Sequence, residues 1–258
     1  MPILSERGYL IPALNNEATD YVRCAQQLAC SIRQFEPEAK IAVVTLSDCS
    51  DPIFDYVIPL PHGDRSTADN KQCNDWQMFQ ASPFRQTIKL EADMLIASPI
   101  QHWWEMMQHR DVCVSTGCRD YYDQPAESRF YRKLFDTNNL PDVYNAVTYW
   151  RVSDTAKEFF KLVRVIFENW PEYRKLLTFA DDEASTDVVY AMAAKIIGLE
   201  KCTMPFASYP RIVHMKKHIV NTRTDNWTRE LVWETDPLRI QTVAQWGAFH
   251  YHIKDWQP

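Results

Sequence analysis

The first 46 residues place an apolar strand, an amphipathic helix and a second apolar strand in that order. Residues 7–13 are mainly apolar and are closed by Asn15 and Asn16, which favours a strand followed by a turn. Between residues 18 and 35, apolar side chains recur at the spacing of one helix face. Residues 40–46 form a continuous apolar run of the kind found in buried parallel strands. Strand, helix and strand in succession begin a right-handed βαβ unit, so the sequence predicts an α/β fold.

Further elements follow along the chain. Apolar runs predict strands at residues 56–60, 87–91, 111–116 and 142–150, with Pro59 indicating a sheet edge. Amphipathic spacing predicts helices at residues 100–107, 154–167 and 186–197; Asp154 is expected to cap the second, and the third ends at Gly198. Residues 117–140 have few regular signals, and short strands at residues 211–215 and 228–234 are expected near the end. The expected architecture is a mixed, mainly parallel central sheet flanked by helices, with a small C-terminal β-rich part.

Composition and missing motifs exclude several function classes. The chain has only five glycines, with no Gly-x-Gly-x-x-Gly, Walker loop or Gly-x-Ser-x-Gly, which disfavours dehydrogenases, P-loop ATPases and serine hydrolases. Its seven cysteines form no Cys-x-x-Cys pair, which indicates free thiols in a reducing compartment. We see neither a membrane span nor a signal peptide, so we expect a cytoplasmic protein without a membrane partner.

Two acids at the end of an apolar strand carry the first chemical signal. Residues 86–96 read as a short strand that ends on Glu91 and Asp93. Alternate side chains of an extended segment point the same way, so these two carboxylates are expected to converge. Converging carboxylates at the carboxyl end of a central strand are what a hard divalent cation and its bound phosphates require.

Read in order, these segments resemble a sugar-nucleotide glycosyltransferase of the Rossmann-like GT-A type, nearest to the glycogenin and galactosyltransferase-like pattern. Residues 84–95 resemble the strand that ends in the family's Asp-x-Asp motif, with Glu91 in place of the first Asp. Residues 142–149 resemble the acceptor-side strand, although Ala146 and Val147 replace its usual glycine. Residues 250–256 are similar to the family's closing His…Lys-Pro-Trp, with a shorter His-to-Lys spacing. The chain as a whole also looks like proteins encoded by tailed bacteriophages.

The resemblance implies one glycosyltransferase domain over residues 1–258. Residues 1–116 are the expected nucleotide-sugar-binding half and residues 117–258 the acceptor-side half. It implies Mn²⁺ or Mg²⁺ as cofactor and a UDP-sugar as donor. The expected metal ligands are Asp93, Glu91, His250, His252 and His214. The expected nucleotide-sugar contacts are Asn16, Tyr21, Asp75, Trp76, Glu91, Lys217 and Lys254. The expected catalytic acids are Asp181, Asp182 and Glu183, acting as general base or binding sugar hydroxyls.

The sequence leaves the acceptor and several roles open. Some phage glycosyltransferases modify hydroxymethylated pyrimidines, so a hydroxyl on such a DNA base is the expected acceptor, in the host cytoplasm if the chain is phage-encoded. A glycan, lipid or protein acceptor is the alternative, as is a non-catalytic binding protein of the same fold. Asp181, Asp182 and Glu183 also suit a plain helix N-terminus. A nucleotidyltransferase is disfavoured because Asn15 and Asn16 stand where it has a Gly-rich loop.

Overall fold

Six strands form the central sheet, in the order β3 (Tyr56–Ile58), β2 (Ile41–Val44), β1 (Ser5–Pro12), β4 (Phe84–Leu90), β8 (Val143–Arg151) and β6 (Val112–Thr116). In this computed structural model, residues 2–66, 72–120, 132–179, 184–204, 210, 212–215, 230–236, 239–244 and 247–251 are described. The first four strands are parallel, whereas β8 runs antiparallel to both β4 and β6. The predicted mixed, mainly parallel sheet is confirmed, with β3 at its edge.

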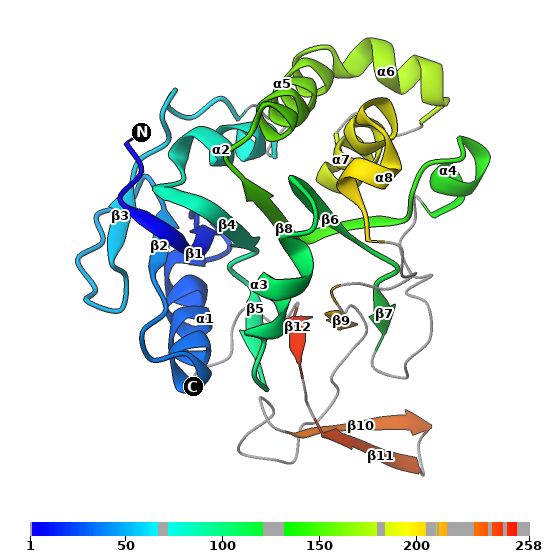
Figure 1. Ribbon diagram of the computed structural model, residues 1–258. Helices are drawn as coiled ribbons and strands as arrows, with labels where there is room; N and C mark the ends of the chain where they lie inside the picture. Colours follow the sequence, from blue (N-terminus) through cyan, green and yellow to red (C-terminus); the bar gives the residue numbers. More distant parts are fainter. Residues whose placement is uncertain are drawn as a thin grey trace.

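Helices cover both faces of this sheet (Figure 1). Side chains alternate along β1, so that Leu10 enters one core cluster whereas Tyr9 and Ile11 enter another. Helix α1 (Tyr21–Phe35) contributes its apolar stripe to the cluster of Tyr9. Helices α5 (Asp154–Glu168) and α7 (Thr186–Ile197) belong to the cluster of Leu10. Because both faces are covered, successive residues of β2 and β8 are buried, and β2 is a continuous apolar run instead of an alternating one.

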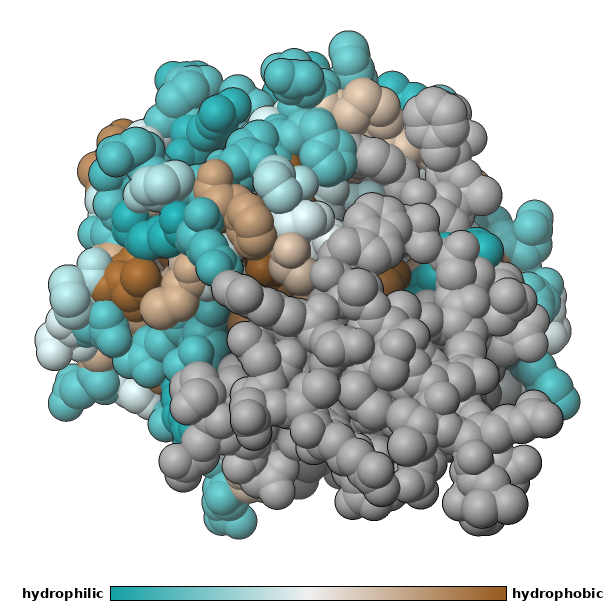
Figure 2. Space-filling model, turned by 90° about the horizontal axis from the view of Figure 1, so that it is seen from below, coloured by the Kyte–Doolittle hydropathy of each residue, from teal (hydrophilic) through white to brown (hydrophobic). Residues whose placement is uncertain are grey.

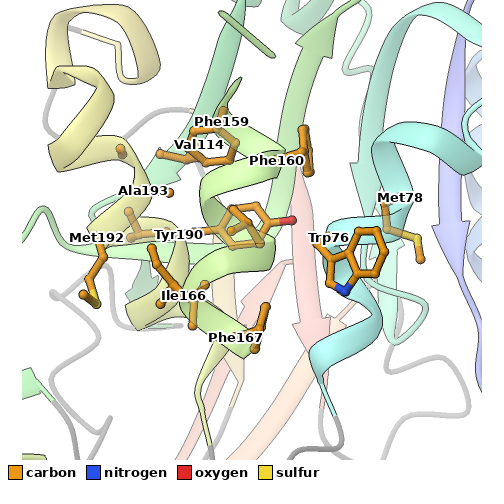
Figure 3. Packing of buried hydrophobic residues seen from close by; sticks show 14 of the residues in the cluster. Trp76, Met78, Val114, Phe159, Phe160, Ile166, Phe167, Tyr190, Met192 and Ala193 are labelled. Atoms are coloured by element: carbon orange, nitrogen blue, oxygen red, sulfur yellow. The ribbon is translucent and has the colours of Figure 1, made fainter. Parts of the chain in front are cut away.

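Aromatic residues fill the core between α5, α7 and the segment that precedes β4. That segment consists of the 3₁₀ helix η1 (Cys73–Gln77) and the short helix α2 (Met78–Ala81). Figure 3 shows Tyr190 of α7 between Phe159, Phe160 and Ile166 of α5, with its hydroxyl directed toward the side of Trp76. The Phe159 and Tyr190 rings meet edge to face with centroids 5.4 Å apart. This core therefore fixes η1 against the sheet.

A second sheet of four strands lies beside the carboxyl end of β4. Its order is β5 (Met94–Ile96), β12 (Ala248–Tyr251), β9 (Ile212–Met215) and β7 (Arg119–Asp120). Strands β10 (Glu230–Asp236) and β11 (Arg239–Ala244) form a separate antiparallel hairpin. Together, β9 to β12 confirm the predicted C-terminal β-rich part. The remaining helices are α3 (His102–Met107), α4 (Arg132–Thr137), α6 (Trp170–Leu177) and α8 (Leu199–Cys202).

The structure corrects three details of the expected elements. Helix α1 begins at Tyr21, not at residue 18, because the Asp20 carboxylate accepts a hydrogen bond from the Arg23 N–H and caps the helix there. Helix α5 is capped by Ser153, and Asp154 is its first residue. The strand expected over residues 86–96 is divided into β4 and β5, which belong to different sheets. Helix α7 has the bounds predicted, and Gly198 ends it with a φ of 112° that suits glycine.

Figure 2 shows one face of the molecule, on which the described residues are mostly hydrophilic, with a few hydrophobic residues between them. All seven cysteines are free thiols, as predicted. Among the described residues, no helix combines the length and the hydropathy that a membrane span needs.

We predict that Ser153→Ala lowers the free energy of unfolding by about 1 kcal/mol, because the Ser153 hydroxyl accepts from the Ala156 N–H at 3.1 Å. Ser185→Ala is the matched control, since Ser185 caps α7 without a side-chain hydrogen bond. Urea unfolding followed by circular dichroism measures both changes. Equal losses in the two variants would show that the hydrogen bond at Ser153 contributes nothing.

Candidate functional site

The two acids lie in the connection between the two sheets. Glu91, Ala92 and Asp93 link the end of β4 to the start of β5, and Asp93 sits in a turn, not in the extended segment expected. The Glu91 N–H donates to the carbonyl of Ala146 in β8 at 3.0 Å, and the Asp93 carbonyl accepts from the Tyr251 N–H of β12 at 3.0 Å. The connection is thus held by one strand of each sheet.

Glu91, Asp93 and His250 come together as a possible cation site. Their ligand atoms all lie within 4.8 Å of one another, and they are the only such group found among the described residues. His250 Nε2 is 2.9 Å from Asp93 Oδ2 and 3.5 Å from Glu91 Oε2. β12 pairs with β5, so that His250 faces Met94, the residue after Asp93. The pairing of β12 with β5 therefore places the His250 imidazole next to Glu91 and Asp93.

Burial and neighbouring charges shift the pKa values of groups at this cluster. Burial raises the pKa of Glu91; His250 acts against this shift and the charge of Asp93 adds to it. Burial, with the charges of Asp93 and Glu91 adding to it, raises the pKa of Tyr21, at the start of α1, to about 12.

Tyr144 stands behind His250. Its hydroxyl is hydrogen-bonded to Nδ1 of His250 and to Nδ1 of His214. The rings of Tyr144 and His214 meet nearly perpendicular, with centroids 4.8 Å apart. β9 runs parallel to β12 with His214 opposite His250, which places both imidazoles against the same tyrosine. Burial raises the pKa of Tyr144 well above its ordinary value, and nearby Cys118, Glu91, Asp187 and Asp93 add to this.

A buried ion pair lies next to the acids. Lys89 of β4 is 1% exposed and its Nζ is 2.8 Å from Asp75 Oδ1. The other oxygen of Asp75 accepts from Asn145 Nδ2 at 3.2 Å and from the hydroxyl of Tyr190. Lys89 also lowers the pKa of Glu91, an effect smaller than those of burial, His250 and Asp93, so the pair contributes to the field at the site.

Asp187 is a further buried acid near the site. It lies in the first turn of α7 and its Oδ1 accepts from the backbone N–H of Asn145 at 2.7 Å. Its charge raises the pKa values of Glu91 and Tyr144, although burial is the larger cause for both. Lys89, Tyr144, Asp187 and Tyr190 were not singled out from the sequence. Lys89 could have been found, because a lysine inside an apolar strand needs a buried partner.

The comparisons with known proteins identify the architecture. No protein-family model and no curated protein matches the chain. Mouse xyloside xylosyltransferase 1 in its apo form is similar over 99% of this chain and 100% of its own, with a TM-score of 0.54 and 10% identity. The galactosyltransferase LgtC in complex with donor and acceptor sugar analogs is similar over 95% of this chain and 86% of its own, with a TM-score of 0.50 and 12% identity. An active-site mutant of LgtC gives a TM-score of 0.50 at 13% identity over 95% of this chain and 86% of its own.

This chain has the GT-A glycosyltransferase fold. At 10–13% identity the likeness concerns the fold, and the chemistry has to be argued from the site. In this GT-A fold, Glu91 and Asp93 follow the central strand β4 at its carboxyl end. That edge is where ligands bind in open α/β sheets.

The other residues expected at the site differ in their exposure and in their contacts. Asn16 is exposed, and its Oδ1 accepts from the Ala18 and Thr19 N–H groups at 2.9 Å. Trp76 is buried and contacts the ring of His62 and the guanidinium of Arg164. Both oxygens of Asp75 are engaged within the protein. His214 reaches the cluster through Tyr144. Asp181, Asp182, Glu183, Lys217, His252 and Lys254 lie outside the described residues.

We predict that Lys89→Met destabilises the protein by about 3 kcal/mol, because it leaves the Asp75 carboxylate in a buried position without its cation. Lys175→Met is the control, since Lys175 pairs with Glu172 on the surface and its loss should have little effect. Chemical unfolding of the two variants measures the difference. A small loss for Lys89→Met would mean that Asn145 and Tyr190 alone satisfy Asp75.

Proposed function

We propose that this protein is a metal-dependent glycosyltransferase that moves a sugar from a nucleotide-diphosphate sugar, a UDP-sugar, to an acceptor hydroxyl. One observation carries the proposal: Glu91, Asp93 and His250 converge after the central strand of a GT-A fold. The glycosyltransferase neighbours support transfer from a nucleotide sugar in general terms. Their names include both a galactosyl- and a xylosyltransferase, so either a hexose or a pentose fits the proposal.

The three side chains fit a hard or borderline divalent cation. Carboxylate oxygens suit Mg²⁺ and Mn²⁺, and an imidazole nitrogen is an additional ligand that suits Mn²⁺ better than Mg²⁺. In an octahedral shell with ligands at about 2.1 Å, neighbouring ligand atoms are about 3.0 Å apart. The distances of 2.9 Å and 3.5 Å from His250 Nε2 to the two carboxylates are close to that spacing. Asp93, Glu91 and His250 would therefore hold Mn²⁺.

The chemistry needed at this position is neutralisation of a leaving group. A sugar nucleotide breaks its bond at the anomeric carbon, and negative charge develops on the departing diphosphate. When bound, the cation supplies Lewis-acid stabilisation of that charge. Tyr21, whose pKa responds to the charges of the two acids, is proposed to stack on the nucleotide base, and Asn16, in the loop before α1, is proposed to contact the nucleotide. His250 and Asp93 are buried, which keeps their geometry fixed when substrate binds.

Further roles are proposed, from the resemblance to the GT-A family, for residues outside the described part of the chain. Lys217 and Lys254 are the proposed diphosphate contacts, and His252 is a proposed further metal ligand. Asp181, Asp182 and Glu183 precede α7 and are proposed to bind sugar hydroxyls or to remove the proton of the acceptor. Residues 1–116 remain the proposed donor half and residues 117–258 the acceptor half.

The acceptor is a finer proposal that rests on the resemblance to phage-encoded enzymes. We propose a hydroxyl on a hydroxymethylated pyrimidine of phage DNA. The experiment is incubation of the protein with UDP-sugars, Mn²⁺ and DNA that contains hydroxymethylcytosine or hydroxymethyluracil, followed by mass spectrometry of the nucleosides. A hexose or pentose mass on the modified base is the expected product. If parallel reactions show transfer to a glycan, lipid or protein while the DNA stays unmodified, the DNA acceptor is wrong and the modified molecule is the acceptor.

We predict that Asp93→Asn weakens Mn²⁺ binding in the presence of UDP by more than about 100-fold, because it removes a carboxylate ligand. Loss of a group that only holds a ligand in place already costs about 10–100-fold. Asp136→Asn is the control, because Asp136 is exposed on α4. Isothermal titration of UDP and Mn²⁺ measures the effect, together with UDP-sugar hydrolysis. Unchanged binding by the Asp93 variant would overturn the metal assignment.

We also predict the donor from thermal stability. UDP-sugars with Mn²⁺ should raise the melting temperature, whereas GDP-, CDP- and TDP-sugars, or any nucleotide with EDTA, should raise it less. The stabilisation should follow RT ln(1 + [L]/Kd), so a ligand at 100 times its Kd contributes about 2.7 kcal/mol. Equal stabilisation with and without Mn²⁺ would contradict a cation that bridges protein and diphosphate.

A further inference from the structure

We propose that Tyr144 and His214 are positioning residues that hold His250 in the tautomer and orientation needed to bind the cation. This inference rests on the proposed metal-dependent function and extends it beyond the three ligands. It assigns His214 a place behind the metal ligand, where it acts through a tyrosine hydroxyl.

The geometry comes from three separate strands. His250 lies on β12, His214 on β9 and Tyr144 on β8 of the central sheet. The pairing of β9 with β12 sets His214 opposite His250, and the hydroxyl of Tyr144 bonds to Nδ1 of both rings. All three residues are buried, with exposed fractions of 2% for His214, 4% for Tyr144 and 6% for His250. Such a buried, hydrogen-bonded arrangement restricts rotation of each ring.

The hydrogen bonds have a direction that suits metal binding. Nε2 of His250 faces Asp93 and Glu91, so it is the nitrogen that would bind the cation. A neutral imidazole that binds through Nε2 carries its proton on Nδ1. That Nδ1–H donates to the Tyr144 oxygen, and the Tyr144 hydroxyl donates to Nδ1 of His214, which accepts. The tautomer of His250 is therefore linked to the tautomer of His214 through the Tyr144 hydroxyl.

A tyrosine hydroxyl has both the donor and the acceptor capacity that this arrangement needs. A protonated hydroxyl between two Nδ1 atoms can accept from one of them while it donates to the other. The same role is common among metal-bound histidines, whose second nitrogen bonds to an outer group that fixes the ring.

The test measures cation binding to the full chain. Tyr144→Phe keeps the ring and removes the hydroxyl. Tyr149→Phe is the matched control, because Tyr149 is buried on the same strand and its hydroxyl donates to Gln86 Oε1 at 3.1 Å, in a hydrogen bond separate from the metal cluster. Electron paramagnetic resonance of free Mn²⁺ gives the dissociation constant, with Mn²⁺ alone and with UDP. We expect a 10–100-fold weaker Mn²⁺ affinity for Tyr144→Phe and less than about threefold for Tyr149→Phe.

Two variants at His214 separate positioning from simple packing. His214→Asn keeps an acceptor near the place of Nδ1 and should retain Mn²⁺ affinity within about threefold, whereas His214→Leu should lose as much as Tyr144→Phe. A structural role alone would lower the melting temperature of both His214 variants and would leave the Mn²⁺ affinity of the folded protein unchanged. Thermal unfolding in EDTA records that difference.

The outcomes distinguish this inference from the function on which it rests. Wild-type affinity in Tyr144→Phe and His214→Leu, with loss in Asp93→Asn, would overturn the positioning role and leave the metal site intact. No Mn²⁺ binding by the wild-type chain, with or without UDP, would overturn both. Weak binding in Tyr144→Phe and His214→Leu, with retention in Tyr149→Phe and His214→Asn, is the result that the geometry predicts.

Discussion

The change of sheet at Glu91–Asp93 is the constraint on which the candidate site depends. At this point the chain leaves β4 of the six-stranded sheet and enters β5 of the four-stranded one, before it returns to the first sheet as β6 and β8. Two backbone hydrogen bonds hold the connection, one to Ala146 of β8 and one to Tyr251 of β12. The strand that holds Asp93 also carries His250, so one pairing both fixes the acid and supplies the imidazole. A break in the β5–β12 pairing would therefore dismantle the whole cluster.

Several acids lie around this connection among the residues that the structure describes. Asp75 pairs with Lys89, Glu91 and Asp93 lie at His250, and the charges of Asp93 and Asp187 act on Glu91. Asp93 and Asp187 are buried and Glu91 is partly buried, and this desolvation, with the charge of Asp93, raises the pKa of Glu91. The proposed divalent cation would relieve the repulsion between these carboxylates, and its remaining positive charge would attract an anionic diphosphate. The cluster of acids is thus compatible with a metal and a phosphate ligand that bind together.

Much of the fold could be predicted from local signals in the sequence. Features that depend on contacts between residues far apart in the chain could not. The apolar spacing of α7 and its closing Gly198 are contained within the helix, and its bounds were predicted correctly. The division between β4 and β5 was missed, because nothing local in residues 86–96 reveals that the two ends of this segment join different sheets. The convergence of Glu91 and Asp93 was predicted from an extended strand, but a turn produces it. Tyr144 went unassigned because its partners, His214 and His250, are 70 and 106 residues away in the chain.

The two acids of the connection are not equivalent, and their surroundings suggest different tasks. The Asp93 side chain is 11% exposed and lies 2.9 Å from His250 Nε2, whereas that of Glu91 is 32% exposed and lies 3.5 Å away. Asp93 is also the residue whose carbonyl is anchored to β12, so its short side chain has little freedom. We infer that Asp93 is the inner ligand of the cation. Glu91, with one more methylene and a more open position, can complete the metal shell or accept from a ribose hydroxyl of the donor. A glutamate in place of the family's usual aspartate is then compatible with the proposed site, because the longer side chain can reach the cation from its more open position.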